Sequence, residues 1–422
     1  MNKQDAVIIV TNNNYKKFIG GSNKFLLEMI ENFRKSHVES IVILPIYGIN
    51  NRLKSADFFY VGVYYQNQFI GIYKLNDILG GLIQIQQEYN LNYKNIIINH
   101  LENWDLPALL NLLRNIYLPV NIIVHDFCMV CDYYMKPDGN GDICMKSYSL
   151  PGEEKCKECK YKDLEIDYFK KINLFLSSIE PLINSVIFPS EFTMNYGIKF
   201  FPVLKQKSVI REHLIIKNHN ANNQLNKKKD NKKIKIAYIG AFVRHKGCFE
   251  WKLLLEKLSD DPDMEFYYIG QETFFDQDNR VVHLAADYNK GQTTDQILKE
   301  ANIDVAFLWS TLPETYSYTY YEAMSANCFV ITGAFSGNIS AQVKKNKNGK
   351  AFDNINECAN YLKSNEFVND LVEFKANHNG CELFLNDSTE HLVTDCPGYK
   401  IEGKAAKPNR FLTSLYKQIR DY

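Results

Sequence analysis

Residues 234–247 read IKIAYIGAFVRHKG, and this stretch decides the fold. An apolar run of strand length ends in Gly240 and is followed by a short basic turn that closes at Gly247. The next stretch, WKLLLEKL, has the apolar spacing of a helix. A buried strand that leads through a glycine turn into a helix is the repeating unit of a parallel α/β sheet.

The same alternation runs through both halves of the chain. Apolar runs of strand length lie at 7–10, 40–45, 95–100, 121–126 and 185–190 in the first half, and at 265–270, 281–286, 304–309 and 329–333 in the second half. Helical patterns separate many of these runs. Two successive βα arrays predict an α/β protein with two doubly wound, Rossmann-like domains.

We expect the first domain to span 1–200 and the second to span 234–400. Between them, residues 217–233 are polar and of low complexity, which is typical of a linker or long surface loop. Residues 401–422 end in a pattern that predicts a closing helix, whereas residues 373–410 show no clear pattern.

Composition limits the functional class. Lys and Arg together number 49, as do Asp and Glu, so the chain lacks the basic excess that non-specific nucleic-acid binding needs. No run approaches the ~20 apolar residues of a membrane span. The amino-terminal stretch lacks the pattern of a signal peptide. We therefore expect a cytoplasmic protein that binds no nucleic acid, either free or at the inner face of the membrane.

The most informative motif is PETYSYTYYEAM at 313–324. It places Glu314 and Glu322 eight residues apart across a predicted strand-to-helix junction, with the helix expected to begin near Tyr316. First-turn backbone N–H groups favour a diphosphate, and the residues expected to offer them are Ser317, Tyr318 and Thr319. If the whole motif were helical, the two carboxylates would be about 12 Å apart along the axis, far enough to contact the sugar and the ribose of one donor.

The basic turn supplies the opposite charge. Arg244 and Lys246 precede Gly247 at the start of the next predicted helix, and Gly240 ends the strand before them. Glycines permit tight turns and close backbone approach. Cations at this edge are suited to stabilising a diphosphate leaving group, whose charge grows as a glycosidic bond breaks.

Together these motifs resemble family 4, the large family of retaining glycosyltransferases with the GT-B fold. That family's signature is two glutamates separated by seven residues and followed by Ala, and residues 313–324 match it. Lys246 and Gly247 also match a family segment, but the family's Arg after the first glycine is Ala241 here. Arg244 is the nearest substitute. The GT-B fold implies two Rossmann-like domains that face a central cleft.

The resemblance also implies the reaction. A nucleotide-diphosphate sugar would be the co-substrate, and the acceptor would be a polysaccharide or a lipid-linked oligosaccharide, with peripheral contact to a membrane. Glu314 and Lys246 would act in catalysis, Glu322 would bind the ribose, and no divalent metal would be needed for the transfer. The alternative is a catalytically inactive subunit that keeps the fold as a binding scaffold, which the departure at Ala241 favours.

Two further features are weaker. Gly20 and Gly21 precede the first predicted helix, where the family has a glycine-rich loop facing the donor phosphate, although Ser22 is equally well explained as a helix cap. His125 ends the apolar run at 121–126 and resembles a family histidine near the donor sugar, which would make it catalytic. A structural histidine at the end of a strand is the alternative for His125, and more so for His100.

Five cysteines cluster at 128–159 with the spacing C-x2-C-x12-C-x11-C-x2-C. In a reducing compartment this clustering predicts a closed, structural zinc site rather than disulfides. Free thiols and an iron–sulfur cluster are alternatives. The family resemblance selects four ligands in the loop at 128–160: Cys131, Cys144, Cys156 and Cys159. A paired CxxC arrangement would instead use Cys128 in place of Cys144.

Overall fold

The computed structural model describes residues 3–17, 21–47, 49–50, 59–131, 159, 161–218, 233–270, 279–285 and 292–420. These residues form two compact units. Unit 1 contains the described residues up to 211 and those from 387 onward, and unit 2 contains those of 212–386. None of the helices in the described part of the chain has the length and apolar character needed to cross a bilayer.

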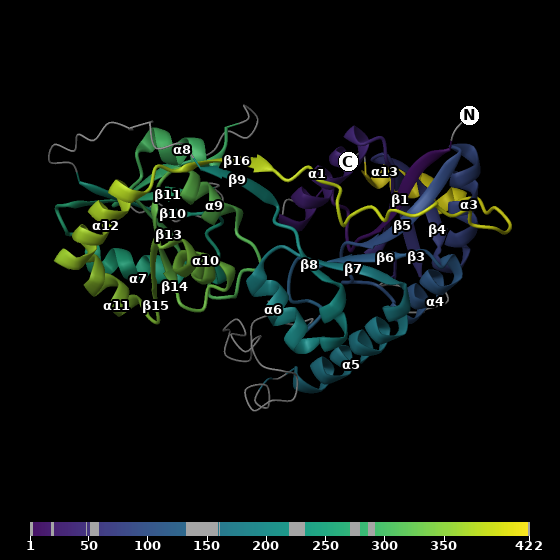
Figure 1. Ribbon diagram of the computed structural model, residues 1–422, viewed down its shortest axis with the longest axis horizontal. Helices are drawn as coiled ribbons and strands as arrows, with labels where there is room; N and C mark the ends of the chain where they lie inside the picture. Colours follow the sequence, from purple (N-terminus) through teal and green to yellow (C-terminus); the bar gives the residue numbers. More distant parts are fainter. Residues whose placement is uncertain are drawn as a thin grey trace. The chain divides into compact units, whose positions relative to one another are not determined.

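Unit 1 is built on an eight-stranded sheet of order β4-β3-β2-β1-β5-β6-β7-β8 (Figure 1). Its strands are β1 (Gln4–Val10), β2 (Glu39–Pro45), β3 (Tyr60–Tyr65), β4 (Gln68–Lys74), β5 (Leu91–Ile98), β6 (Val120–Ile123), β7 (Ile183–Phe188) and β8 (Ser208–Ile210). All neighbouring pairs are parallel except β2–β3 and β3–β4. Its helices are α1 (Gly21–Lys35), α3 (Ile78–Glu88), α4 (Leu106–Ile116), α5 (Lys162–Ile179), α6 (Glu191–Phe200) and α13 (Arg410–Arg420).

Unit 2 contains a six-stranded, fully parallel sheet of order β12-β11-β10-β13-β14-β15. Its strands are β10 (Ile234–Ile239), β11 (Met264–Ile269), β12 (Val281–Leu284), β13 (Val305–Leu308), β14 (Phe329–Gly333) and β15 (Gly349–Phe352). Its helices are α7 (Cys248–Leu258), α8 (Thr294–Ala301), α9 (Tyr318–Ser325), α10 (Asn338–Asn346), α11 (Ile355–Leu362) and α12 (Asn365–Asn377). A separate antiparallel pair joins β9 (Leu214–Asn218) to β16 (Cys381–Leu385).

Most of the apolar runs of the sequence are strands buried on both faces, although β12 at the sheet edge is partly exposed. In β10, Ile236 and Tyr238 belong to the core on one face of the sheet, and Ala237 and Ile239 belong to the core on the other. Successive side chains of a strand point to opposite faces of the sheet. When both faces are covered, the strand is apolar along its length and does not alternate between apolar and polar residues. The predicted α/β class and the two doubly wound sheets are therefore confirmed.

The boundary between the units differs from the predicted one. The chain leaves unit 2 after Asn386 rather than at 400 and returns to unit 1. The predicted linker at 217–233 begins inside β9, and residues 219–232 lie outside the described part. The predicted closing helix begins at Arg410 rather than at 401.

Residues 387–409, here called the return segment, cover part of one sheet face of unit 1 in place of a helix. The side chains of Asn95 and Asn121 each donate to the carbonyl oxygen of Leu392 at 3.1 Å. The Oδ1 atom of Asn121 accepts hydrogen bonds from Asn184 and Ser185, both at 3.0 Å. Buried side-chain amides on neighbouring strands thus satisfy a backbone carbonyl of a turn that belongs to no helix or strand.

We predict that Asn121→Ala destabilises unit 1. The substitution removes the three hydrogen bonds that the Asn121 side chain makes to Leu392, Asn184 and Ser185, each worth about 0.5–1.5 kcal/mol of unfolding free energy. Thermal and urea unfolding measure the loss. Asn115→Ala, at an exposed position on α4, is the matched control and is expected to change stability by less than about 0.5 kcal/mol. Equal stability of the two variants would contradict the structural role of the return segment.

Candidate functional site

The candidate site of unit 2 lies at the carboxyl ends of β10 and β13, where the strand order of the sheet reverses. Open parallel sheets bind ligands at this topological switch point. The turn after β10 carries the basic residues, and the segment after β13 carries the first glutamate of the motif.

Lys246 and Glu314 form the central contact of this site. The Lys246 Nζ atom lies 2.5 Å from Glu314 Oε1. The Ser310 hydroxyl donates to the same oxygen at 3.0 Å. The Glu314 side chain is 16% exposed and that of Lys246 is 38% exposed, so the lysine is the more accessible of the two. The structure therefore brings together two predicted catalytic residues from turns 68 residues apart in the sequence.

Two glycines allow the backbones of this site to approach closely. Gly247 has φ +84°, and a Cβ atom there would lie 2.0 Å from the carbonyl oxygen of Trp309. Gly337 has φ +66°, and a Cβ atom there would lie 2.6 Å from the backbone nitrogen of Glu314. Both positions require glycine because an L-residue would be strained at this φ and would clash with backbone. Lys246 thus directly precedes one of these glycines, and the backbone of Glu314 packs against the other.

The backbone of Glu314 is fixed from both sides. Its N–H donates to the carbonyl oxygen of Ser336 at 3.2 Å, and its own carbonyl oxygen accepts from the N–H of Asn338 at 2.8 Å. Glu314 therefore lies in extended backbone, bridged to the residues that begin α10. Sequence reasoning missed Ser310, Ser336 and Asn338. The stretch FSGN shortly after β14 carried a signal for Ser336 and Asn338, whereas Ser310 follows β13.

The helix of the motif begins later than predicted. It starts at Tyr318 rather than near Tyr316, because Ser317 is its N-cap and accepts a hydrogen bond from the N–H of Tyr320 at 3.3 Å. Ser317 is thus a cap rather than a first-turn residue, and Tyr318 and Thr319 are the first two residues of the helix.

Glu322 lies within α9 and is half-buried. Only the steps from Tyr318 onward are helical, so the separation of the two glutamates does not follow from the rise of a continuous helix. The two carboxylates nevertheless come from the same connection between β13 and α9, with Glu314 before the helix and Glu322 inside it.

The residues around the basic turn occupy separate positions. The Arg244 guanidinium lies over the ring of Phe249, 5.2 Å from its centroid, rather than beside Glu314. Gly240 has φ +114°, with open space where a side chain would be. The carbonyl oxygen of Ala241 accepts a hydrogen bond from the Tyr238 hydroxyl at 2.8 Å. Position 241 thus supplies no cation, and Lys246 is the cation in contact with the motif.

His125 lies in unit 1 at the carboxyl end of β6. Its Nε2 atom is 2.9 Å from Asn99 Oδ1, an oxygen that can only accept, and the Asn99 amide nitrogen donates to Thr11 Oγ1 at 3.2 Å. Nε2 of His125 therefore carries the proton. Burial, with a smaller contribution from the charge of His100, lowers the pKa of His125 to about 3. The imidazole is thus neutral at physiological pH.

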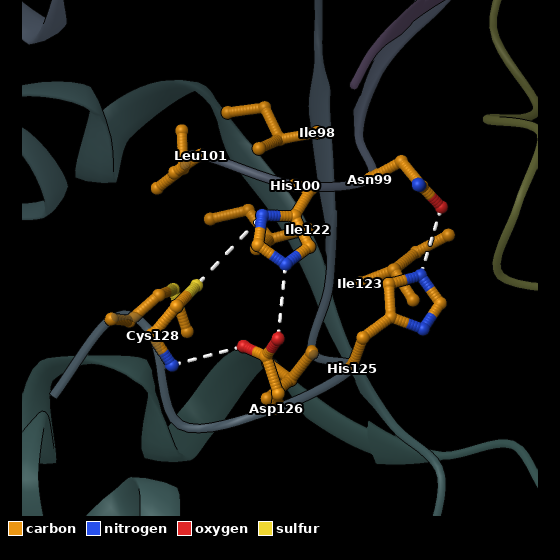
Figure 2. A pocket seen from close by; sticks show the side chains of 11 residues that line it. Ile98, Asn99, His100, Leu101, Ile122, Ile123, His125, Asp126 and Cys128 are labelled. Atoms are coloured by element: carbon orange, nitrogen blue, oxygen red, sulfur yellow. Dashed lines mark hydrogen bonds and ion pairs between the residues drawn. The ribbon is translucent and has the colours of Figure 1, made fainter. Parts of the chain in front are cut away.

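His100, Asp126 and Cys128 form a neighbouring cluster at a small cavity of about 10 Å³ (Figure 2). His100 Nε2 lies 3.0 Å from Asp126 Oδ2, and Cys128 Sγ lies 3.9 Å from His100 Nδ1. Burial opposes ionisation of Asp126, but the charge and hydrogen bond of His100 outweigh it, so the pKa of Asp126 lies below its usual value.

These three side chains are of types that bind metals, and their ligand atoms lie within 4.8 Å of one another. However, both ring nitrogens of His100 already have partners, because Nδ1 accepts the N–H of Glu102 at 3.1 Å while Nε2–H donates to Asp126. The cluster is therefore a complete hydrogen-bond network without an ion. It positions the segment that carries His125.

Some predicted residues lie outside the described part of the chain. Gly20, Cys144 and Cys156 are among them, whereas Gly21 is the first residue of α1. Cys131 and Cys159 lie in the described part, are partly exposed, and form no disulfide with another described cysteine. The described residues thus neither assemble nor exclude the predicted four-cysteine site.

Comparison with known proteins agrees with this architecture. Residues 220–373 match the family model "Glycosyl transferases group 1". The crystal structure of HepE from Anabaena in complex with UDP-glucose is similar, with a TM-score of 0.51, 13% identity, and coverage of 88% of this chain and 93% of that chain. The crystal structure of TarM is similar with a TM-score of 0.50, 12% identity, and coverage of 89% and 94%. Curated protein sequences gave no match.

At these identities the structural likeness shows the fold, and the family match covers unit 2 from β10 to α12. The chain therefore has the GT-B fold, and the match over 220–373 supports the group 1 glycosyl transferases as its broad family.

Proposed function

We propose that this protein is a retaining glycosyltransferase that moves a hexose or related sugar from a nucleotide-diphosphate sugar to a glycan acceptor. The observation that carries the proposal is the Lys246–Glu314 contact at the switch point of unit 2. HepE, similar in fold, was crystallised with UDP-glucose, which supports a nucleotide sugar as donor. The proposed acceptor is a polysaccharide or a lipid-linked oligosaccharide, at the cytoplasmic face of a membrane.

The proposed roles follow from charge and position. Lys246 and the N–H groups of Tyr318 and Thr319 bind the diphosphate, and Glu322 accepts hydrogen bonds from the ribose hydroxyls. Glu314 accepts hydrogen bonds from the sugar. In the protein without donor, Glu314 neutralises Lys246. Donor binding replaces this partner with phosphate oxygens, which bind a lysine as a point charge.

The transfer step moves one sugar between two oxygens. The bond between the anomeric carbon and the diphosphate oxygen breaks, and its electron pair stays on the leaving diphosphate. The acceptor hydroxyl oxygen bonds to the anomeric carbon on the same face, and its proton passes to a diphosphate oxygen. Lys246 stabilises the growing charge in a partly water-excluded site. His125 takes part as a neutral hydrogen-bonding group, since its pKa is lowered by burial to about 3.

We predict that Glu322→Ala weakens binding of a nucleoside diphosphate by about 1.5–3 kcal/mol, because a charged acceptor of ribose hydroxyl hydrogen bonds is lost. Isothermal titration calorimetry with the nucleoside diphosphate alone isolates this effect, since the ligand contains the ribose but no sugar. An unchanged dissociation constant would refute the ribose assignment.

Glu314→Ala is expected to behave differently. It removes most turnover but leaves nucleoside diphosphate binding unchanged or tighter, because Lys246 loses the carboxylate that competes with phosphate. Calorimetry and donor turnover are measured on the same preparation, and Glu314→Gln tests whether the charge or the hydrogen bond matters. Equal loss of diphosphate binding in the Glu314 and Glu322 variants would mean that the roles are misassigned.

We further propose a structural zinc bound by Cys131, Cys144, Cys156 and Cys159. The cysteine spacing supports it, and a closed thiolate site stabilises a loop without taking part in catalysis. The purified protein is then expected to contain about one zinc per chain, and a chelator to lower its melting temperature. Elemental analysis of untagged protein measures the metal.

Cys159→Ser is expected to lose this zinc, whereas Cys396→Ser, at a cysteine outside the loop, retains it. Cys128→Ser and Cys144→Ser distinguish the two ligand sets, with Cys144 as the expected fourth ligand. Fully stable, metal-free wild-type protein would show that the cysteines are ordinary thiols.

A further inference from the structure

Residues 399–417 of unit 1 are held by backbone hydrogen bonds to β5, to helix α3 and to the edge strand β4. The backbones of Tyr399 and Tyr93 exchange two hydrogen bonds, at 2.7 and 3.2 Å. Farther along, the N–H of Ala406 donates to Gly80 and the N–H of Asn409 donates to Ile72, at 2.9 and 2.7 Å. These hydrogen bonds hold the stretch at several points along its length, so the backbone positions of its exposed side chains are fixed.

The charged side chains that are exposed here are mainly cationic. We call Lys400, Lys404, Lys407, Arg410 and Lys417 the basic strip, and all five are exposed. Glu402 is the only acidic residue between positions 400 and 418, although the whole chain has equal numbers of basic and acidic residues. Within the part of the chain that the structure describes, no ion pair involves a residue of the basic strip.

Helix α13 carries the last two residues of this strip, Arg410 and Lys417, and is amphipathic. Leu412 and Tyr416 pack against the core of unit 1, and the Tyr416 ring lies 5.0 Å from that of Phe69. Thr413 Oγ1 accepts the N–H of Ile72 at 2.9 Å, which fixes the helix on β4. One turn apart on the same helix, Phe411 is 75% exposed and Leu415 is 41% exposed.

We propose that α13 and the basic strip form a docking surface for an anionic lipid bilayer. A helix that lies in the membrane interface combines exposed Phe and Leu with Lys and Arg, so that apolar side chains enter the acyl boundary and cations meet lipid phosphates. Clustered cations without protein partners match the negative potential of such a surface. The long stems of Lys and Arg also allow apolar burial with the charge kept at the interface.

This inference rests on the peripheral membrane contact of the proposed function and deepens it by naming the surface and the lipid charge. It also gives a physical reason for a lipid-linked acceptor, since both substrate and enzyme would lie at one interface. Binding to vesicles is measured without donor or acceptor. Failure of the docking surface therefore leaves the transfer reaction untested, and loss of turnover in the glutamate variants says nothing about docking.

The test is a titration of the full-length protein with vesicles of phosphatidylcholine alone and with vesicles that also contain phosphatidylglycerol. Wild-type protein is expected to bind the anionic vesicles, and to bind them less at high salt, because salt screens exposed charges. The double variant Lys404→Gln, Lys407→Gln is expected to bind about 25-fold more weakly, since each cation is worth roughly a factor of five at an anionic surface. Phe411→Ser is expected to lose about tenfold or more.

Val372→Ser is the matched control. Val372 is 64% exposed on α12 of unit 2, a helix that carries Glu366, Asp370 and Glu373, and its substitution is expected to leave vesicle binding unchanged. Melting temperatures confirm that each variant is folded. Absence of wild-type binding to anionic vesicles would overturn the proposal, as would equal binding to neutral vesicles or equal losses in the control. If this face bound a protein partner instead of a membrane, the wild-type protein would not bind the anionic vesicles.

Discussion

The candidate site depends on a single ionic contact, that of Lys246 with Glu314 beside Ser310. A lysine at the carboxyl edge of a parallel sheet is suited to binding an anion, and an unpaired carboxylate as buried as that of Glu314 would be unfavourable. Lys246 pairs with this carboxylate in the absence of donor. The backbones that carry Lys246 and Glu314 pass close to other backbone segments, which requires glycine at 247, beside the Trp309 carbonyl, and at 337, beside the Glu314 backbone. The ion pair and the two glycines therefore depend on one another.

The two units carry polar groups of different kinds at corresponding strand ends. In unit 2 the groups are ionic and partly accessible. In unit 1, His125 is neutral and hydrogen-bonded to Asn99, while the His100–Asp126 pair is held within a closed network. In the proposed reaction the charge that develops on the diphosphate is met by Lys246 and helix N–H groups, so the reaction needs no proton from a histidine, and a neutral His125 is compatible with it.

The sequence predicted the fold well, because strands buried on both faces leave continuous apolar runs, and such runs are readable without tertiary information. It also singled out Lys246 and Glu314, which the structure places in contact, because each follows the end of a predicted strand. It misplaced the helix start, although Ser317 was a cap signal that a closer reading of the motif would have used. The return segment was not predicted, since its partners are asparagines of β5 and β6 far away in sequence, and hydrogen bonds of this kind have no periodicity.

The central claim is that Lys246 stabilises the diphosphate leaving group of a sugar donor. The most direct measurement is release of nucleoside diphosphate from a panel of nucleotide sugars, by wild-type protein and by Lys246→Met, with both shown to be folded. The account predicts that wild-type protein releases diphosphate from at least one donor and that Lys246→Met loses at least about 100-fold of this rate, the cost typical of removing one transition-state charge partner. A wild-type protein that binds a donor yet releases nothing, or a variant with the wild-type rate, would contradict the account.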